Sequence, residues 1–146
     1  MPRGVLAIDQ GTTSSRALVI DRAGRVLGSA QQPIETAYPH PGWVNQDASA
    51  LWMTTLRVAR DAIERAGVPA KDLAAIGIAN QRETTILWDR ATGEPVAPAI
   101  VWQSRQSAPQ VDAIRARGMA DRFQRTTGLV PDAYFSATKI AWLLES

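Results

Sequence analysis

The first thirty residues divide into short apolar blocks separated by polar turns. Residues 5–8 form a compact apolar run that closes at Asp9, which predicts a buried strand ending in a polar loop. Residues 16–21 and 25–30 predict two further strands with a glycine-containing turn between them. Because the connections are too short to hold crossover helices, we expect an antiparallel meander.

A long helix is well marked after residue 46. Asp47 is a good N-cap, and Gly67 suits the left-handed position that follows a helix end. The apolar positions between them recur near a spacing of 3.6 residues and predict one buried face, formed by Leu51, Trp52, Leu56, Ala59, Ile63 and Ala66. Residues 73–79 follow as an unbroken apolar run, which predicts a strand covered on both faces.

The second half of the chain predicts shorter elements. We expect a strand at 85–89, an extended segment ending at Trp102, a helix at about 107–117, a shorter one up to Thr127, and a last one capped by Ser136. This order predicts an α/β domain with a mixed sheet. No G-x-G-x-x-G motif is present, which argues against a dinucleotide fold. The last apolar pattern reaches the chain end without a stop signal, so we expect a piece of something larger.

Composition narrows the classes of function. The 45% hydrophobic and 21% charged fractions are ordinary for a globular domain, and 16 Lys plus Arg against 14 Asp plus Glu leave no basic block for nucleic acid. Cysteine is absent and His40 is the only histidine, which excludes disulfides and zinc sites built from thiolates or several histidines. No stretch predicts a signal peptide or a membrane span, so we expect a cytoplasmic protein.

One candidate site is the polar loop D-Q-G-T-T-S-S-R at 9–16. Asp9, at a strand end, is placed to hold magnesium, and Gly11 lets backbone amides approach phosphate oxygens. Arg16 adds a permanent charge with forked donors. The hydroxyl donors are Thr12, Thr13 and Ser14. The residues alone leave an alternative open, a hydroxyl-rich turn capped by Asp9.

A second candidate site follows the most apolar run. Arg82 and Glu83 lie in the polar sequence N-Q-R-E-T-T and offer donors and acceptors suited to an uncharged ligand with several hydroxyls. A structural ion pair is the alternative. Trp102 and Tyr134 also lie at element ends, where an aromatic ring packs against a ligand's carbon skeleton or simply belongs to the core.

Five motifs occur in order along nearly the whole chain: DQGTTSSR at 9–16, YPHPGWVNQD at 38–47, IGIANQRETTILWD at 76–89, AIVWQ at 99–103 and TGLVPDAYFSATK at 127–139. Together they resemble the N-terminal domain of the glycerol kinases, within the carbohydrate kinase family that includes xylulokinase and gluconate kinase. The resemblance implies a ribonuclease H-like domain of the actin/hexokinase type. It would cover 1–146 and be incomplete at its C-terminal end, with the second nucleotide-binding domain absent from this chain.

The resemblance also implies roles for the candidate residues. Thr12, Thr13, Ser14 and Arg16 would contact the phosphates of ATP, with Asp9 at the magnesium ion. Arg82, Glu83 and Tyr134 would bind the hydroxyls of glycerol, and Trp102 would cover its carbon chain. The product would be sn-glycerol 3-phosphate, made by an enzyme that is a homo-oligomer when intact.

The expected catalytic base, an aspartate in a later G-D-Q motif, is not in these residues, so the resemblance implies no catalytic residue here and an inactive isolated chain. The sequence departs from the family pattern at Gln106, Ala133 and Asn45 without removing a proposed ligand. Two rivals remain: another sugar kinase of the family, and a non-catalytic ATPase-like or ligand-binding module such as an actin-type assembly protein.

Overall fold

The computed structural model describes residues 3–146, which form two compact units. Unit 1 consists of residues 3–35 and Asp47–Gln81, and unit 2 of Thr36–Gln46 and Arg82–Ser146. Unit 1 contains β1 (Gly4–Gln10), β2 (Ser14–Asp21), β3 (Val26–Pro33), α1 (Ala48–Ala66), a short 3-10 turn (Ala70–Asp72) and β5 (Leu73–Asn80). Unit 2 contains β4 (Asn45–Gln46), β6 (Ala99–Ile100), α2 (Ala108–Ala116), α3 (Ala120–Thr127) and α4 (Ser136–Glu145).

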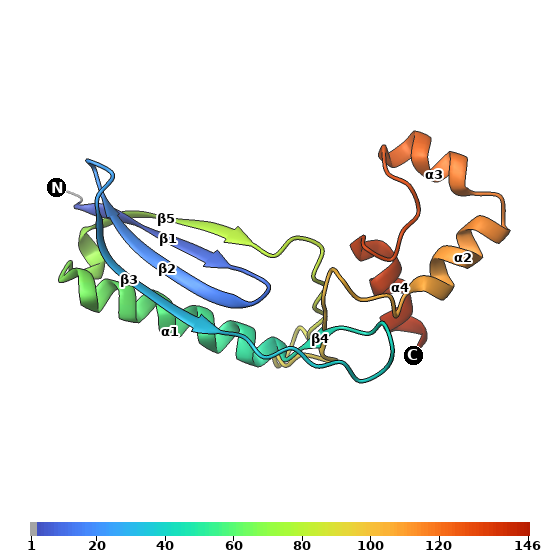
Figure 1. Ribbon diagram of the computed structural model, residues 1–146, viewed down its shortest axis with the longest axis horizontal. Helices are drawn as coiled ribbons and strands as arrows, with labels where there is room; N and C mark the ends of the chain where they lie inside the picture. The colour runs from blue at the N-terminus through green and yellow to red at the C-terminus, as the bar shows by residue number, and fades with distance from the viewer. Residues whose placement is uncertain (1–2) are drawn as a thin grey trace. The chain divides into compact units, whose positions relative to one another are not determined.

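A four-stranded mixed sheet forms unit 1, in the order β3-β2-β1-β5. The pairs β1–β2 and β2–β3 are antiparallel and β1–β5 is parallel, so both the predicted meander and the predicted mixed sheet are confirmed. The single helix α1 runs along one face of this sheet (Figure 1). It begins where expected, because Asp47 accepts a hydrogen bond from the Ala50 amide at 2.9 Å, and it ends at Gly67 with a φ of 59°.

Small residues bring α1 unusually close to the sheet. Alternate positions of the strands point at the helix and form the core with it: Leu6, Ile8, Ala17, Val19, Ala30, Val58 and Ala62. At Gly28 of β3 a Cβ atom would lie 2.4 Å from the Ala62 carbonyl oxygen and 2.5 Å from the Ala66 amide nitrogen. Both contacts are with helix backbone, so Gly28 is required for this close approach.

We therefore expect Gly28→Ala to lower the free energy of unfolding by at least about 2 kcal/mol, because strand and helix must separate. Gly77→Ala is the matched control: Gly77 lies in β5 of the same sheet, and an added Cβ there would meet nothing within 4 Å. Urea unfolding followed by circular dichroism measures both. Equal midpoints for the two variants would show that the close approach is not needed.

Two predictions about buried faces need correction. Trp52 is 62% exposed, because the buried face of α1 runs through Leu51, Thr54, Val58 and Ala62, about a quarter-turn away from it. The strand predicted at 73–79 forms as β5, but it is not covered on both faces. It is the edge of the sheet, and in the described part of the chain no element packs on it to cover Ile78, which is 71% exposed.

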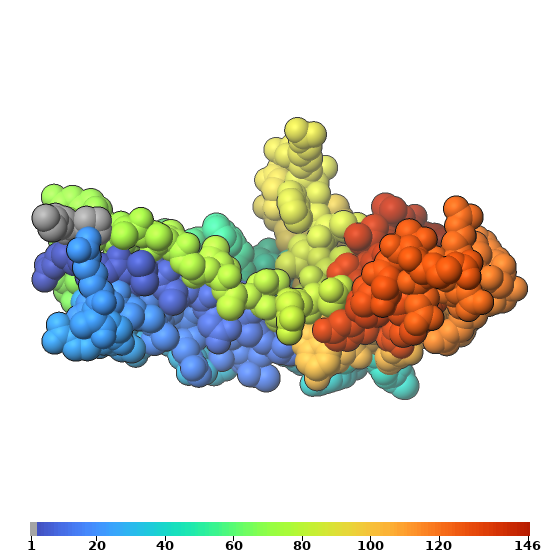
Figure 2. Space-filling view, turned by 90° about the horizontal axis from the view of Figure 1, so that it is seen from above, coloured from blue at the N-terminus to red at the C-terminus, as the bar shows by residue number. Residues whose placement is uncertain are grey.

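Unit 2 is built on short pairings. β4 and β6 are antiparallel, and the predicted strand at 85–89 is wrong: Thr85 and Trp88 form only isolated bridges, to Ile100 and Pro95. Between Thr85 and Ile100 the chain makes an excursion that projects from the rest of unit 2, in yellow in Figure 2. Asp89 closes its tip by accepting hydrogen bonds from the amide and hydroxyl of Thr92 and from the amide of Ala91, which hold the pKa of that carboxyl below its ordinary value.

The helices of unit 2 begin close to where the sequence predicts them. α2 and α3 match the expected spans, and Gly128 ends α3 in the left-handed conformation. The predicted cap of α4 is wrong, since Phe135 occupies the N-cap position and Ser136 is the first helical residue. Among residues 3–146 no helix has the length and apolarity required to cross a bilayer.

Candidate functional site

The polar loop of unit 1 is a tight connection between β1 and β2. The Gly11 amide donates to the Ser14 carbonyl at 3.0 Å, so Thr12 and Thr13 occupy the tip. A Cβ on Gly11 would approach the Ser14 oxygen to 3.0 Å, which explains the glycine. Thr13 is exposed, while Thr12 and Ser14 are half-buried. The loop therefore presents backbone and hydroxyl groups at the end of the sheet.

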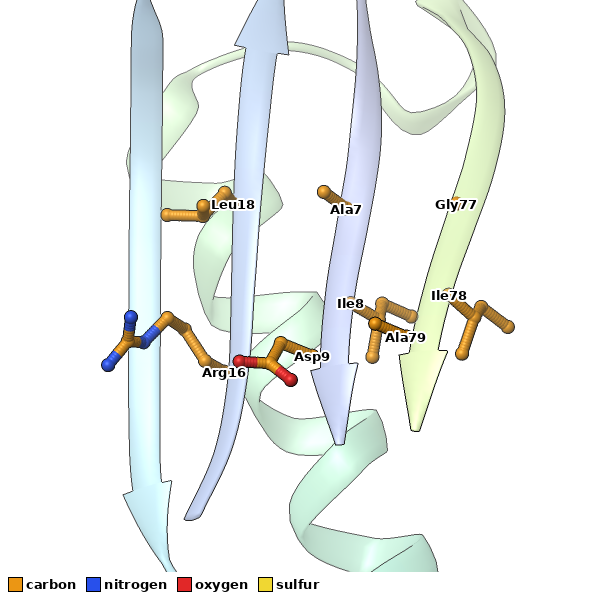
Figure 3. A pocket seen from close by; sticks show the side chains of 8 residues that line it. All are labelled: Ala7, Ile8, Asp9, Arg16, Leu18, Gly77, Ile78 and Ala79. Carbon is orange, nitrogen blue, oxygen red and sulfur yellow. The ribbon is translucent and has the colours of Figure 1, made fainter. Parts of the chain in front are cut away.

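Asp9 and Arg16 lie opposite each other on β1 and β2 and are both exposed. Their side chains project from the face of the sheet turned away from α1, beside a shallow hollow of about 320 Å³ whose floor includes Ala7, Leu18 and Gly77 (Figure 3). A carboxylate and a guanidinium thus share one polar edge of an otherwise apolar hollow.

A hydrogen-bonded chain steadies the cationic side of this edge. The Arg16 guanidinium donates to Gln31 Oε1 at 3.1 Å, and Gln31 Nε2 donates to Ser14 Oγ at 2.8 Å. Gln31 therefore ties the arginine on β2 to the hydroxyl at the start of that strand. No sequence pattern indicates this role, because Gln31 lies in β3, fifteen residues away from Arg16.

The donor set of this edge fits a polyphosphate with magnesium. Hydroxyls, loop amides and a guanidinium are donors to phosphate oxygens. Magnesium takes oxygen ligands and is often held by one or two carboxylates together with substrate phosphates and waters. Asp9 offers a carboxylate of this kind, and among residues 3–146 there is no group of three or more acidic or histidine side chains that could hold a metal ion.

The second candidate site lies in unit 2 and centres on Glu83. Its carboxylate oxygen Oε2 accepts two hydrogen bonds from Ser136, one from the amide at 2.9 Å and one from the hydroxyl at 2.8 Å. Glu83 thus caps the N-terminus of α4 from a distant part of the chain, in place of the local cap predicted at Ser136. Neither an Arg82–Glu83 pair nor a plain surface position describes this arrangement.

Two aromatic rings lie on the same side of unit 2. The rings of Trp102 and Tyr134 meet edge to face with centroids 6.0 Å apart, and Phe135 packs on Tyr134 at 5.1 Å. Trp102 is half-buried and Tyr134 is 36% exposed, so both retain surface for a ligand. Neither ring is a fully buried core residue.

An acidic turn fixes the backbone at Tyr134. Asp132 Oδ1 accepts from the Tyr134 amide at 2.8 Å and from Arg105 Nη1 at 2.8 Å. The Tyr134 amide and the Arg105 guanidinium together hold the pKa of Asp132 below its ordinary value. The turn that carries the tyrosine ring is therefore anchored on both sides.

Lys139 is the residue that sequence reasoning missed. It lies in α4, is 0% exposed, and its Nζ donates to the Glu83 carbonyl at 2.9 Å and to the Tyr134 carbonyl. Burial lowers the pKa of Lys139 to about 8, partly opposed by the charges of Glu83 and Asp132. Its only sequence signal is a lysine inside the apolar stretch of the last helix.

The structure brings together Glu83, Trp102 and Tyr134, with the exposed Arg82 next in the chain. The five predicted phosphate and magnesium residues lie together in unit 1, and the four predicted glycerol residues lie in unit 2. Each group is thus gathered within its own unit.

Comparison with known proteins places both groups of residues within one protein family. The N-terminal domain of the FGGY family of carbohydrate kinases matches residues 4–146, almost the whole chain. The chain belongs to this family. The resemblance inferred from the five ordered motifs is therefore confirmed, and so is the family's actin-like ATPase fold.

Several FGGY relatives are named glycerol kinase. That of Aromatoleum aromaticum is 59% identical over 141 residues, and that of Deinococcus radiodurans is 56% identical over 142, each alignment covering 97% of this chain. The chain spans 28% of the length of each.

Solved structures agree with this assignment. Plasmodium falciparum glycerol kinase with ADP matches with a TM-score of 0.88 and 31% identity, over 98% of this chain and 29% of that one. A xylulose kinase from Rhodospirillum rubrum shares the fold with a TM-score of 0.86 at 24% identity, over 98% of this chain and 29% of its own. The FGGY fold is therefore common to kinases of different substrates, and substrate must be argued from the site.

Proposed function

We propose that this FGGY domain supplies the phosphate-binding and polyol-binding residues of a glycerol kinase. The observation that carries the proposal is the grouping of Glu83, Trp102 and Tyr134, two hydroxyl-binding side chains and an aromatic cover, in a chain 59% identical to a glycerol kinase. Such a grouping suits a small polyol, because buried polar groups reject analogues that leave them unpaired.

In the proposed reaction a terminal hydroxyl oxygen of glycerol forms a bond to the γ-phosphorus of ATP. The bond from that phosphorus to the β,γ-bridging oxygen breaks, ADP leaves, and the hydroxyl proton passes to a general base. The products are sn-glycerol 3-phosphate and ADP. The family resemblance assigns the base to an aspartate of a G-D-Q motif, which these 146 residues do not contain.

The described residues take the remaining roles. Arg82, Glu83 and Tyr134 bind and orient the hydroxyls, and Trp102 covers the carbon chain. The loop of Thr12, Thr13 and Ser14 binds phosphate oxygens together with Arg16. Asp9 would hold magnesium directly or through water, and the bound ion would neutralise charge on the phosphates. A cytoplasmic, homo-oligomeric intact enzyme also stays a prediction.

The test is a chimera in which this chain replaces the matching N-terminal segment of the Aromatoleum aromaticum glycerol kinase. We expect it to phosphorylate glycerol with a kcat/KM at least about a hundredfold higher than for xylulose or gluconate, whose longer carbon chains do not fit a site shaped for three carbons. A coupled assay for ADP release on each substrate measures this. Preference for xylulose or gluconate would overturn the substrate, and nucleotide-dependent polymerisation without turnover would favour an actin-like module.

A further inference from the structure

Glu83 holds an unusual backbone conformation. Its φ of 65° makes it the one non-glycine residue with positive φ among residues 3–146. A left-handed conformation is strained for a non-glycine residue and persists only when the surroundings fix it. Something in unit 2 must therefore hold this residue in place.

Both ends of Glu83 are held from α4. The carboxylate oxygen Oε2 is fixed by the amide and the hydroxyl of Ser136, and the carbonyl oxygen accepts from Lys139 Nζ. The side chain and the backbone of Glu83 are thus tied to successive turns of one helix.

Lys139 also reaches the second ligand residue. The same Nζ donates to the Tyr134 carbonyl and lies 5.9 Å from the centroid of the Tyr134 ring. One fully buried ammonium group therefore bridges two segments that lie fifty-one residues apart in sequence, 83 and 134. An ammonium has three donors and no acceptor, so two carbonyl oxygens are suitable partners.

We propose that Lys139 is a positioning residue for the polyol site: with Ser136, it fixes the relative placement of Glu83 and Tyr134 without contacting the substrate. The proposal rests on the function proposed above. It is physically reasonable because binding side chains must be held to within about 0.5 Å, and displacement by about 1 Å costs up to a hundredfold in rate.

The charge environment supports the ammonium form. Glu83 and Asp132 both favour it, and Asp132 is itself paired with Arg105. With a pKa of about 8 the side chain is mainly protonated at pH 7, so it keeps its donors under ordinary assay conditions. A neutral buried methionine of similar length would remove the Lys139 donor from both carbonyl oxygens, leaving that of Glu83 with only the long 3.4 Å hydrogen bond from the Thr85 hydroxyl.

The decisive variant is Lys139→Met, assayed in the chimera described above. We expect the KM for glycerol to rise at least about tenfold while the KM for ATP changes less than about twofold. The matched control is Thr138→Val on the same turn of α4. Thr138 is also buried, and its hydroxyl bonds with the Ser107 hydroxyl at 3.1 Å and the Phe135 carbonyl at 3.2 Å, not with Glu83 or Tyr134.

The control separates positioning from stability. Thermal unfolding of both variants shows how far each is destabilised. If Lys139 were purely structural, Lys139→Met would change the KM for glycerol and the KM for ATP equally. An unchanged KM for glycerol in Lys139→Met would overturn the proposal. So would a rise in Thr138→Val equal to that in Lys139→Met.

A second variant covers the case in which Lys139→Met does not fold. Ser136→Ala removes one donor to Glu83 Oε2 and keeps the backbone donor, so we expect a KM for glycerol raised about threefold to tenfold. No change there would then overturn the positioning role. If the unaltered chimera prefers another polyol, the proposed function fails alone, and the same KM comparison on that polyol decides the role of Lys139.

Discussion

Purified by itself, the 146-residue chain is expected to transfer no phosphoryl group from ATP to glycerol. It contains the residues proposed to bind phosphate and polyol, but not the general base that the family resemblance assigns. General acid–base catalysis contributes about 10²–10⁴-fold, and loss of the positioning supplied by the rest of the active site would add to this. We therefore expect a rate at least about 10⁴-fold below that of the chimera.

The measurement is the formation of glycerol phosphate, followed by mass spectrometry over long incubation with ATP and magnesium. The chimera is the positive control, since it contains the same 146 residues. Sustained turnover by the purified chain above a sample lacking ATP would refute the expectation. It would also require a general base among the described residues, for which Glu83 and Asp9 would be the first candidates.

Arg82→Ala in the chimera is expected to lower kcat/KM for glycerol roughly 100-fold, the cost of losing a charged hydrogen-bond donor to a substrate hydroxyl. The KM for ATP should change little, since the phosphate-binding residues belong to the other unit. The matched control is Arg90→Ala, which removes another exposed arginine of unit 2, in the excursion between Thr85 and Ile100. Steady-state kinetics with each substrate varied in turn measures both.

Unchanged glycerol KM and kcat in Arg82→Ala would remove this residue from the polyol site. An equal loss in Arg90→Ala would point to a general effect of surface charge. After either result, Glu83 and Tyr134 would remain the proposed polyol-binding residues, because their placement depends on contacts with Lys139 and not on Arg82.

How much the sequence predicted depends on how local each signal is. α1 was predicted closely because its two ends are fixed by adjacent residues, Asp47 and Gly67. The meander was predicted because short connections leave few alternatives. The prediction that the strand at 73–79 is covered on both faces was wrong, because an apolar run shows what a strand can bury and not which elements pack on it.

The site shows the same limit. The sequence indicates Glu83 and Tyr134, but their grouping depends on the family resemblance and not on spacing. Serine is a residue type that commonly caps a helix locally, yet Ser136 donates its hydroxyl hydrogen bond to the Glu83 carboxylate, fifty-three residues away. Lys139 gives almost no signal, because its burial depends on the carbonyl oxygen of Glu83, fifty-six residues away, as well as on that of Tyr134.

The division of the chain into two units limits how recombination between related genes can exchange one unit for another. The backbone passes between the units three times, since Thr36–Gln46 belongs with Arg82–Ser146 although unit 1 flanks it on both sides. No single crossover in a gene can therefore swap unit 2 intact. A recombinant with a new unit 2 needs two inserts, one of them only eleven residues long, and a single junction at residue 81 would join β6 to a foreign β4.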